Sequence, residues 1–211
     1  MNLAAGSLID DVVREIWRHK RINPAALRPG IIGHTKSSGF FSSAIRKVLK
    51  SWGGHDNLVV IENERIGFGD AVMPRAKVNS VQYYNNEIAA GRMQIRFFEV
   101  IGATPEQEKA AARWWMSPKG AYRKRYDWWA FPRLLWKAIF MDIFQRAAGM
   151  EWLWYCTEGV GAAYIRGAGL NPYRPKATNF TPLTTEKRAG IYGPVCPITL
   201  AEITNKIMMD L

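Results

Sequence analysis

The sequence predicts an α+β fold built as a single domain. Strand-like segments follow one another through the middle of the chain, and helical patterns lie before and after them, which favours a largely antiparallel sheet. The chain has 211 residues, a length that suits one domain, 1–211, with a full hydrophobic core. Its 48% hydrophobic and 22% charged residues exclude a disordered or collagen-like chain.

The first part of the chain predicts two amphipathic helices joined by a loop. Apolar residues recur at helical spacing over Leu8–Trp17, and we expect 1–26 to form a helical N-terminal extension. Prolines and a glycine over Asn23–Ile32 indicate a loop that ends in a short strand. Phe40–Leu49 then carries a second apolar helical face.

The middle of the chain predicts a sheet followed by a helix. Glu62–Arg65 suits a hairpin turn between the first two strands. A helix begins at Thr104, with Pro105 at its first position, and runs to about Trp115. The predicted strands are Leu58–Ile61, Ile66–Val72, Val78–Tyr84 and Met93–Ile101.

The last part of the chain predicts an insert and two more helices. Trp128–Arg146 indicates an amphipathic helical excursion, so we place a Trp-rich insert at about 128–150. It serves either as extra core or as an aromatic and basic wall that grips substrate or membrane. The segments after it are a small-residue helix from Cys156 to about Arg166, a loop-rich stretch over Pro172–Pro197 and a closing helix over Ile198–Met209, the last within a C-terminal loop and helix at 183–211.

Three local patterns, in this order, suggest a function. The first runs from Arg28 to Ile61 and contains Pro-Gly-Ile-Ile, then Gly-Phe-Phe-Ser-Ser-Ala-Ile, then Gly-His-Asp-Asn-Leu-Val-Val-Ile. The second is the pair Tyr126 and Asp127, and the third is Trp-Tyr-Cys-Thr-Glu around Cys156. This order resembles the permuted papain-like hydrolases of the NlpC superfamily, the branch with the YiiX-like proteins and the lecithin:retinol acyltransferase-like enzymes.

The resemblance covers 27–182 and implies a circularly permuted papain-like core. In such a core a mostly antiparallel sheet packs against the helix that carries the nucleophilic cysteine. The chain departs from the family pattern in two places. Ile31 stands where the family usually has Asp, and Asp56 and Asn57 follow the His where small or apolar residues are commoner. We expect neither departure to touch the proposed nucleophile or base.

The catalytic candidates are Cys156, His55 and Asp70. A helix N-terminus lowers the pKa of a thiol, which must be a thiolate to attack, and Cys156 begins a predicted helix. A nearby imidazole then accepts the thiol proton, and His55 at the head of a strand is the candidate base. The predicted hairpin brings Asp70 near His55, where it would orient the imidazole, and the family's polar third residue falls on the same strand. The backbone N–H of Cys156 would contribute to an oxyanion hole.

Each candidate has a plainer alternative. Cys156 taken alone would be a packed hydrophobic residue. His34, beside the first strand, is a second candidate base, whereas His19 at the end of the first helix suits a structural role. Cys196 lies in a loop and is interpreted as incidental, and both cysteines are interpreted as free thiols. Three scattered histidines and two distant cysteines offer no zinc spacing, so no metal or other cofactor is predicted.

The leading functional hypothesis is hydrolysis of an amide bond through an acyl-thioester, with a peptidoglycan peptide or related amide as substrate. A lipid acyltransferase or thioesterase with the same triad is the second hypothesis, and a non-enzymatic polyanion-binding module is the third. The net charge of +11 and the pI of about 9.8 suit contact with an anionic surface. The basic run Arg123–Arg125 would contribute to that contact. Nucleic acid is not the expected partner.

Neither a membrane span nor a signal peptide is expected. No run of about 18 apolar residues is present, and Asp10, Asp11 and Arg14 interrupt the apolar stretch that a signal peptide needs. The expectation is a protein made in the cytoplasm. Peptidoglycan would then be reached only through a secretion route or a phage-like delivery machine.

Overall fold

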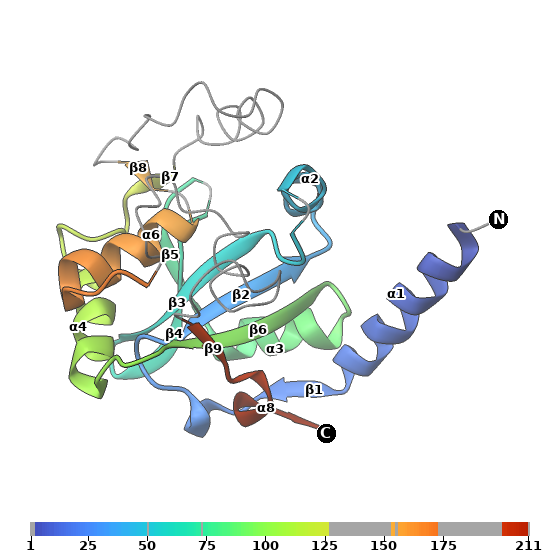
Figure 1. The fold of residues 1–211 in the computed structure, drawn as a ribbon, viewed down its shortest axis with the longest axis horizontal. Helices are drawn as coiled ribbons and strands as arrows, with labels where there is room; N and C mark the ends of the chain where they lie inside the picture. The colour runs from blue at the N-terminus through green and yellow to red at the C-terminus, as the bar shows by residue number, and fades with distance from the viewer. Residues whose placement is uncertain are drawn as a thin grey trace.

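The central element of the fold is a six-stranded antiparallel sheet. The computed structural model describes residues 3–49, 51–72, 74–126, 153–154, 156–172 and 200–210. The predicted α+β class is confirmed, because helices flank a sheet of order β5-β4-β3-β2-β6-β9 (Figure 1). Its strands are β2 (Ile32–Ser37), β3 (His55–Glu62), β4 (Arg65–Asp70), β5 (Lys77–Ser80), β6 (Met93–Val100) and β9 (Leu200–Glu202).

Helices and two small sheets surround this sheet. The helix α1 extends away from the sheet and ends near the pairing of β1 with β10, and the last turns of α6 continue as the π-helix η2 (Figure 1). None of the described helices is long and apolar enough to cross a membrane. The remaining elements are α1 (Leu3–Arg18), β1 (Lys20–Ile22), η1 (Pro24–Ala26), α2 (Phe40–Leu49), α3 (Val81–Ala89), α4 (Pro105–Met116), β7 (Arg125–Tyr126), β8 (Leu153–Trp154), α6 (Cys156–Ala162), η2 (Ala163–Ala168), α8 (Thr204–Ile207) and β10 (Met208–Asp210).

Two hydrophobic clusters hold helices against opposite faces of the sheet. Side chains alternate between the faces of a strand, so Leu58 and Val60 of β3 point to one face and Val59 to the other. On the first face they pack with residues of α4 and α6, among them Trp115. On the second face Val59 packs with residues of α3, among them Tyr84. The strand β3 is therefore covered by a helix on each side.

The hairpin between β3 and β4 forms as predicted. The pairs Ile61 with Ile66 and Glu62 with Arg65 close it, which leaves Asn63 and Glu64 as the turn. Both turn residues have left-handed backbones, with φ of 49° and 64°, as a type I′ hairpin turn requires.

The N-terminus of α4 also forms as predicted. Thr104 accepts a hydrogen bond from the backbone of Gln107, the Gln107 side chain accepts one from Thr104, and Pro105 occupies the first turn.

The strand predicted over Val78–Tyr84 is wrong in its second half. The strand β5 ends at Ser80, whose hydroxyl accepts from the backbone of Tyr83 and so caps α3. Val81, Tyr84 and Ile88 of α3 are buried at helical spacing. The β-branched and aromatic residues of this segment resemble a strand by composition, but the spacing of its apolar residues is that of a helix.

The closing helix predicted over Ile198–Met209 is wrong as well. The described part, 200–210, consists of β9, the short helix α8 and β10. Leu200 pairs with Val100 at the edge of the sheet, and Met208 pairs with Ile22. These pairings join segments far apart in sequence, which local periodicity does not encode. The Trp-rich insert at 128–150 and most of the loop-rich stretch, 173–199, lie outside the described residues.

Candidate active site

The sulfur of Cys156 lies at the beginning of α6, against β3. Cys156 is buried and is a free cysteine. Two residues before it, Trp154 of β8 pairs in parallel with Tyr126 of β7, so the second and third sequence patterns meet at the approach to this helix. The helix begins at Cys156 as predicted, whereas Asp127 and Cys196 lie outside the described residues.

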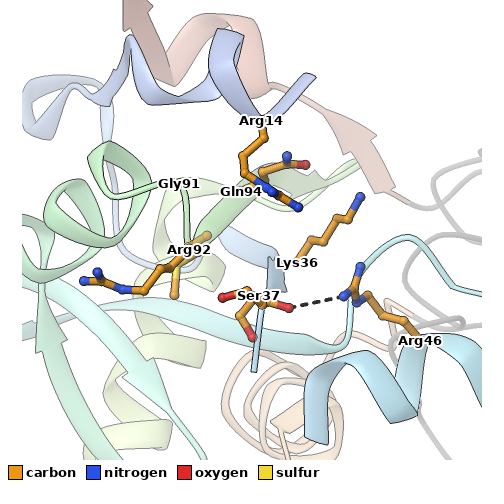
Figure 2. Close-up of a pocket in the computed structure, with 9 residues that line it drawn as sticks. Arg14, Lys36, Ser37, Arg46, Gly91, Arg92 and Gln94 are labelled. Carbon is orange, nitrogen blue, oxygen red and sulfur yellow. Dashed lines mark hydrogen bonds between the residues drawn. The ribbon is translucent and has the colours of Figure 1, made fainter. Parts of the chain in front are cut away.

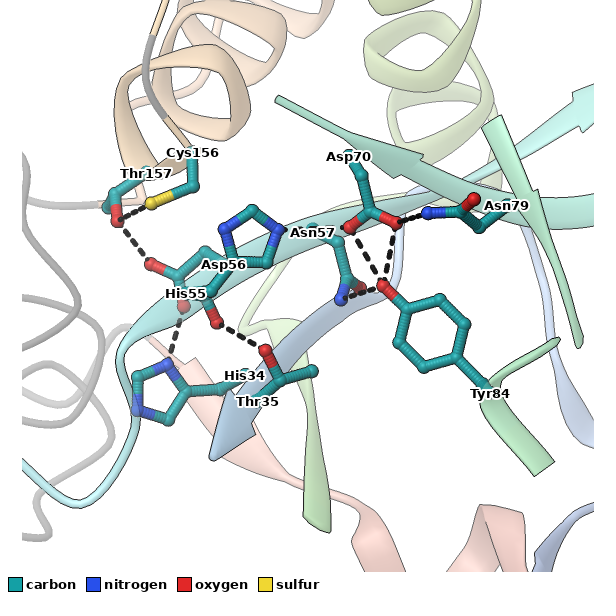
Figure 3. A network of polar contacts seen from close by, with 10 residues as sticks. All are labelled: His34, Thr35, His55, Asp56, Asn57, Asp70, Asn79, Tyr84, Cys156 and Thr157. Carbon is teal, nitrogen blue, oxygen red and sulfur yellow. Dashed lines mark hydrogen bonds and ion pairs between the residues drawn. The ribbon is translucent and has the colours of Figure 1, made fainter. Parts of the chain in front are cut away.

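The imidazole of His55 lies between Cys156 and Asp70 (Figure 3). His55 is the first residue of β3 and its side chain is 19% exposed. Its Nε2 donates to Oδ1 of Asp70 at 3.0 Å. The His55 side chain also shares a hydrogen bond with the Cys156 sulfur. Since Nε2 is committed to the carboxylate, Nδ1 is the nitrogen left for the sulfur. The structure thus brings together the three side chains that the sequence nominated.

The carboxylate of Asp70 is held by donors from two further elements. The Tyr84 hydroxyl of α3 lies 2.7 and 2.8 Å from its two oxygens, and Asn79 of β5 donates to Oδ2 at 2.6 Å. Asn57, which pairs with Asp70 across the hairpin, donates to the Tyr84 hydroxyl at 3.0 Å. These donors satisfy a buried carboxylate with hydrogen bonds and hold it pointed at His55.

Sequence reasoning missed Tyr84 and Asn79. Both fall in the segment interpreted as one strand, which would have placed them along a sheet edge. The signal that identifies Tyr84 is the Ser80 cap together with the apolar spacing of Val81 and Ile88, because these features predict a helix that turns Tyr84 toward the sheet.

A second histidine and aspartate pair lies beside the first, on the opposite face of β3. His34 of β2 bonds through Nδ1 to Oδ1 of Asp56 at 2.5 Å, and both side chains are fully buried. The Thr157 hydroxyl donates to the other oxygen of Asp56 at 2.6 Å and lies 3.7 Å from the Cys156 sulfur. His34 is therefore the partner of Asp56. The other alternative histidine, His19, is at the end of α1, 3.6 Å from Glu15.

Asp56 contradicts the expectation that the departures from the family pattern avoid the nucleophile. Its carboxylate anchors Thr157, the residue next to Cys156. The Asp56 charge raises the pKa of the Cys156 thiol, whereas the Asp56 backbone N–H, which donates to the Cys156 side chain, lowers it. The ring of His34 is in turn enclosed by Gly53, where a Cβ would lie 2.3 Å from Nε2, so the position requires glycine.

The first sequence pattern connects β2 to α4. Arg28 donates through Nε to Glu108 at 2.6 Å, and Tyr164 of η2 donates to the carbonyl of Gly30 at 2.6 Å. Gly30 has φ of +97° and lies against Glu108 with no room for a Cβ. The beginning of this pattern, Arg28 to Gly30, is thus structural, and it holds the layer that carries Cys156 against the sheet.

The electrostatics favour a thiolate and an imidazolium. Burial disfavours the charge on each group, but the attraction between them and their shared hydrogen bond outweigh it. The pKa of His55 is consequently raised well above 6.5, with help from the charge of Asp70. The pKa of the Cys156 thiol is lowered below its ordinary value of 9.0. For Tyr84, burial and then the Asp70 charge raise the pKa, so its hydroxyl remains a neutral donor.

Comparison with solved structures identifies the fold. The chain is similar to the metalloprotein YiiX from Escherichia coli O157:H7, a protein of DUF1105, with a TM-score of 0.51 and 20% sequence identity over 84% of this chain and 88% of that one. The fold is YiiX-like. No family model matches the chain, and no curated protein matches its sequence.

Proposed function

We propose that the chain is a cysteine-dependent hydrolase that cleaves an amide bond, with Cys156 as nucleophile, His55 as general base and Asp70 as the residue that positions His55. The observation that carries this proposal is the imidazole held between a buried sulfur and a buried, fully bonded carboxylate. Such an arrangement of nucleophile, base and orienting group is the general signature of nucleophilic catalysis. The YiiX-like fold is compatible with it.

In the proposed first step the Cys156 thiolate attacks the carbonyl carbon and forms a tetrahedral adduct. Its collapse breaks the bond between carbon and nitrogen, and the His55 imidazolium gives its proton to the departing amine. In the second step neutral His55 takes a proton from water, whose oxygen adds to the thioester. Collapse then releases the carboxylic acid and restores the thiolate and the imidazolium.

The proposed scheme uses no metal ion. YiiX is a metalloprotein, but no group of three or more His, Cys, Asp or Glu side chains that would hold a metal ion comes together in the part of this chain that the structure describes. We therefore assign Asp70 to His55 and derive no step through a metal.

The substrate class proposed is a peptidoglycan peptide or a related amide. Purified peptidoglycan incubated with the protein should release new amino termini, and the Cys156→Ala variant should release none above background. Phosphatidylcholine assayed in parallel separates amide hydrolysis from attack on a lipid ester. Release by Cys156→Ala equal to that by the unmodified chain would contradict the proposal, as would lipid hydrolysis without any release of amino termini.

A further inference from the structure

A basic cavity of about 140 Å³ lies beside β2, next to the strand that carries His55 (Figure 2). It forms where the end of β2 meets the beginning of β6, and α1 and α2 each contribute one residue to its lining. None of the described residues that line it is acidic. Those that matter for its chemistry are Arg14, Lys36, Ser37, Ser38, Arg46 and Gln94.

The fold holds the floor of this cavity in place. Lys36 and Ser37 end β2 and pair with Gln94 and Met93 of β6. Arg46 of α2 donates to the carbonyl of Ser37 at 3.3 Å and to the hydroxyl of Ser43 at 3.0 Å. The cavity therefore has a floor of paired strands and one wall that hydrogen bonds tie to it.

Three cationic side chains from three elements converge on the cavity. Figure 2 shows Arg14 of α1, Lys36 of β2 and Arg46 of α2 directed toward a common space. Arg92 also lines the cavity, but its guanidinium makes two bonds to Glu87, at 2.9 and 2.6 Å, and points away from it. Arg14 pairs with Asp11 at 3.2 Å, an exposed contact within one helix turn that costs little to exchange.

An anion placed in a hollow lined by several cationic side chains is attracted to each of them. Concave walls also strengthen the field, because less water screens the charges. Guanidinium groups form forked, charge-assisted hydrogen bonds with oxyanions, and serine hydroxyls add neutral donors. A doubly charged tetrahedral oxyanion carries more charge and more acceptor oxygens than a single carboxylate, so it can pair with all three surrounding cations.

The cavity is near the proposed catalytic centre. Thr35, one residue before Lys36, pairs with His55, so the cavity and the imidazole flank the same end of β2. The strand β2, which lines the cavity, is the neighbour of β3, which carries His55, and neighbouring strands are about 4.8 Å apart. One substrate can span that distance.

We propose that this cavity binds a phosphate-type oxyanion, and that the substrate of Cys156 carries such a group near its scissile bond. The second half of this inference rests on the proposed function, whereas the first half does not. A phosphoryl group of a soluble substrate and the headgroup of a lipid share this chemistry. The hollow shape, which accepts one group and not a surface, favours the soluble source.

The experiment measures binding of inorganic phosphate by calorimetry to the Cys156→Ala chain, which turns over no substrate. We expect saturable binding at one site that weakens about tenfold in Lys36→Gln, the loss of one charge-assisted contact. Arg14→Gln, on a separate element, should weaken it too and guards against misfolding of the first variant. Lys206→Gln removes an equal charge from an exposed position and should leave binding unchanged.

Equal weakening by Lys36→Gln and Lys206→Gln would overturn the site, because it would reduce the effect to net charge. Absence of phosphate binding would overturn it as well. Vesicles of phosphatidylcholine containing phosphatidylglycerol distinguish the sources, since vesicle binding without phosphate binding assigns the charges to a membrane surface. Phosphate binding together with an unreactive Cys156 would support the phosphate site and contradict the proposed catalysis. A reactive Cys156 without phosphate binding would contradict the phosphate site and leave the proposed catalysis in place.

Discussion

Two histidine and aspartate pairs lie on opposite faces of β3. His55 and Asp70 face α3, whereas His34 and Asp56 face α6, and the distances within the pairs are 3.0 and 2.5 Å. His55 is 19% exposed and His34 is fully buried. The carboxylate of Asp56 is held by Thr157, the neighbour of Cys156, whereas the imidazole of His55 faces the Cys156 sulfur itself.

The contrast shows that residue identity does not decide what such a pair does. A histidine with access to solvent and a thiol can exchange a proton with both. A fully buried histidine that is bonded to a carboxylate and packed against Gly53 is suited to holding its neighbours in place. The first pair is thus suited to chemistry, and the second to fixing α6 so that the sulfur meets the first.

The largest expected effect is on stability, and it comes from the pair of His34 and Asp56. Asp56→Ala leaves buried His34 and Thr157 without their shared partner and should lower the free energy of unfolding by about 3–5 kcal/mol. Denaturant unfolding measures it. The control is Asp11→Ala, which removes an exposed ion pair worth about 0–1 kcal/mol. A loss for Asp56→Ala no larger than the control would remove the distinction between the pairs.

The next effect is on the reactivity of Cys156, and it comes from the pair of His55 and Asp70. Because the pKa of Cys156 is lowered, a larger fraction of its side chain is thiolate at a given acidic pH than in an ordinary thiol. Alkylation at about pH 6 should therefore be fast, and His55→Ala should slow it roughly 100-fold while leaving the rate above about pH 9 similar. Mass spectrometry of alkylated Cys156 follows the rate. His19→Ala, on an exposed helix end, should change nothing, and an unchanged profile in His55→Ala would argue against a thiolate paired with an imidazolium.

A smaller effect on reactivity should come from Asp70. Its charge helps to raise the pKa of His55, so Asp70→Asn should shift the alkylation profile of Cys156 toward higher pH by about one unit, or roughly tenfold in rate at pH 6. Asp210→Asn removes a charge from an exposed position, and its profile should match that of the unmodified chain. If Asp70→Asn lowered stability without moving the profile, the two pairs would be equivalent.

The smallest effect, on the rate of hydrolysis, should come from Tyr84. Tyr84→Phe removes one donor to Asp70 but leaves Asn79 in place, so hydrolysis should fall only several-fold, about 1 kcal/mol. Tyr83→Phe changes the neighbouring, partly exposed ring and should have no effect on the rate. The ratio of the two rates measures the contribution of the hydroxyl, and a loss as large as that of His55→Ala would assign Tyr84 a direct role.

The parts of the site that local patterns describe could be predicted from the sequence. The helix that begins at Cys156 and the hairpin that carries His55 and Asp70 depend on residues close together in the chain. The pair of His34 and Asp56 depends on the register of β2 against β3, and no local pattern reports that register. The partners of Asp70 were missed because a segment rich in β-formers folds as a helix around its cap.

The last two strands of the chain, β9 and β10, were missed for a related reason. The pairing of β9 with β6 joins the last part of the chain to its middle, and the pairing of β10 with β1 joins it to the first part. Their short strands carry too few residues to show a period of two. Only the tertiary contacts of Leu200 and Met208 make them strands.

The tight turn at Asn63 and Glu64 makes the length of this hairpin a determinant of its reactivity. Because successive side chains alternate across a strand, deleting one turn residue and sliding β3 by one position would exchange the faces of His55 and Asp56. The carboxylate of Asp56 would then face α3, and the imidazole of His55 would leave the face on which Asp70 lies. Relatives that keep this chemistry should therefore tolerate changes of residue in the turn far better than changes in its length.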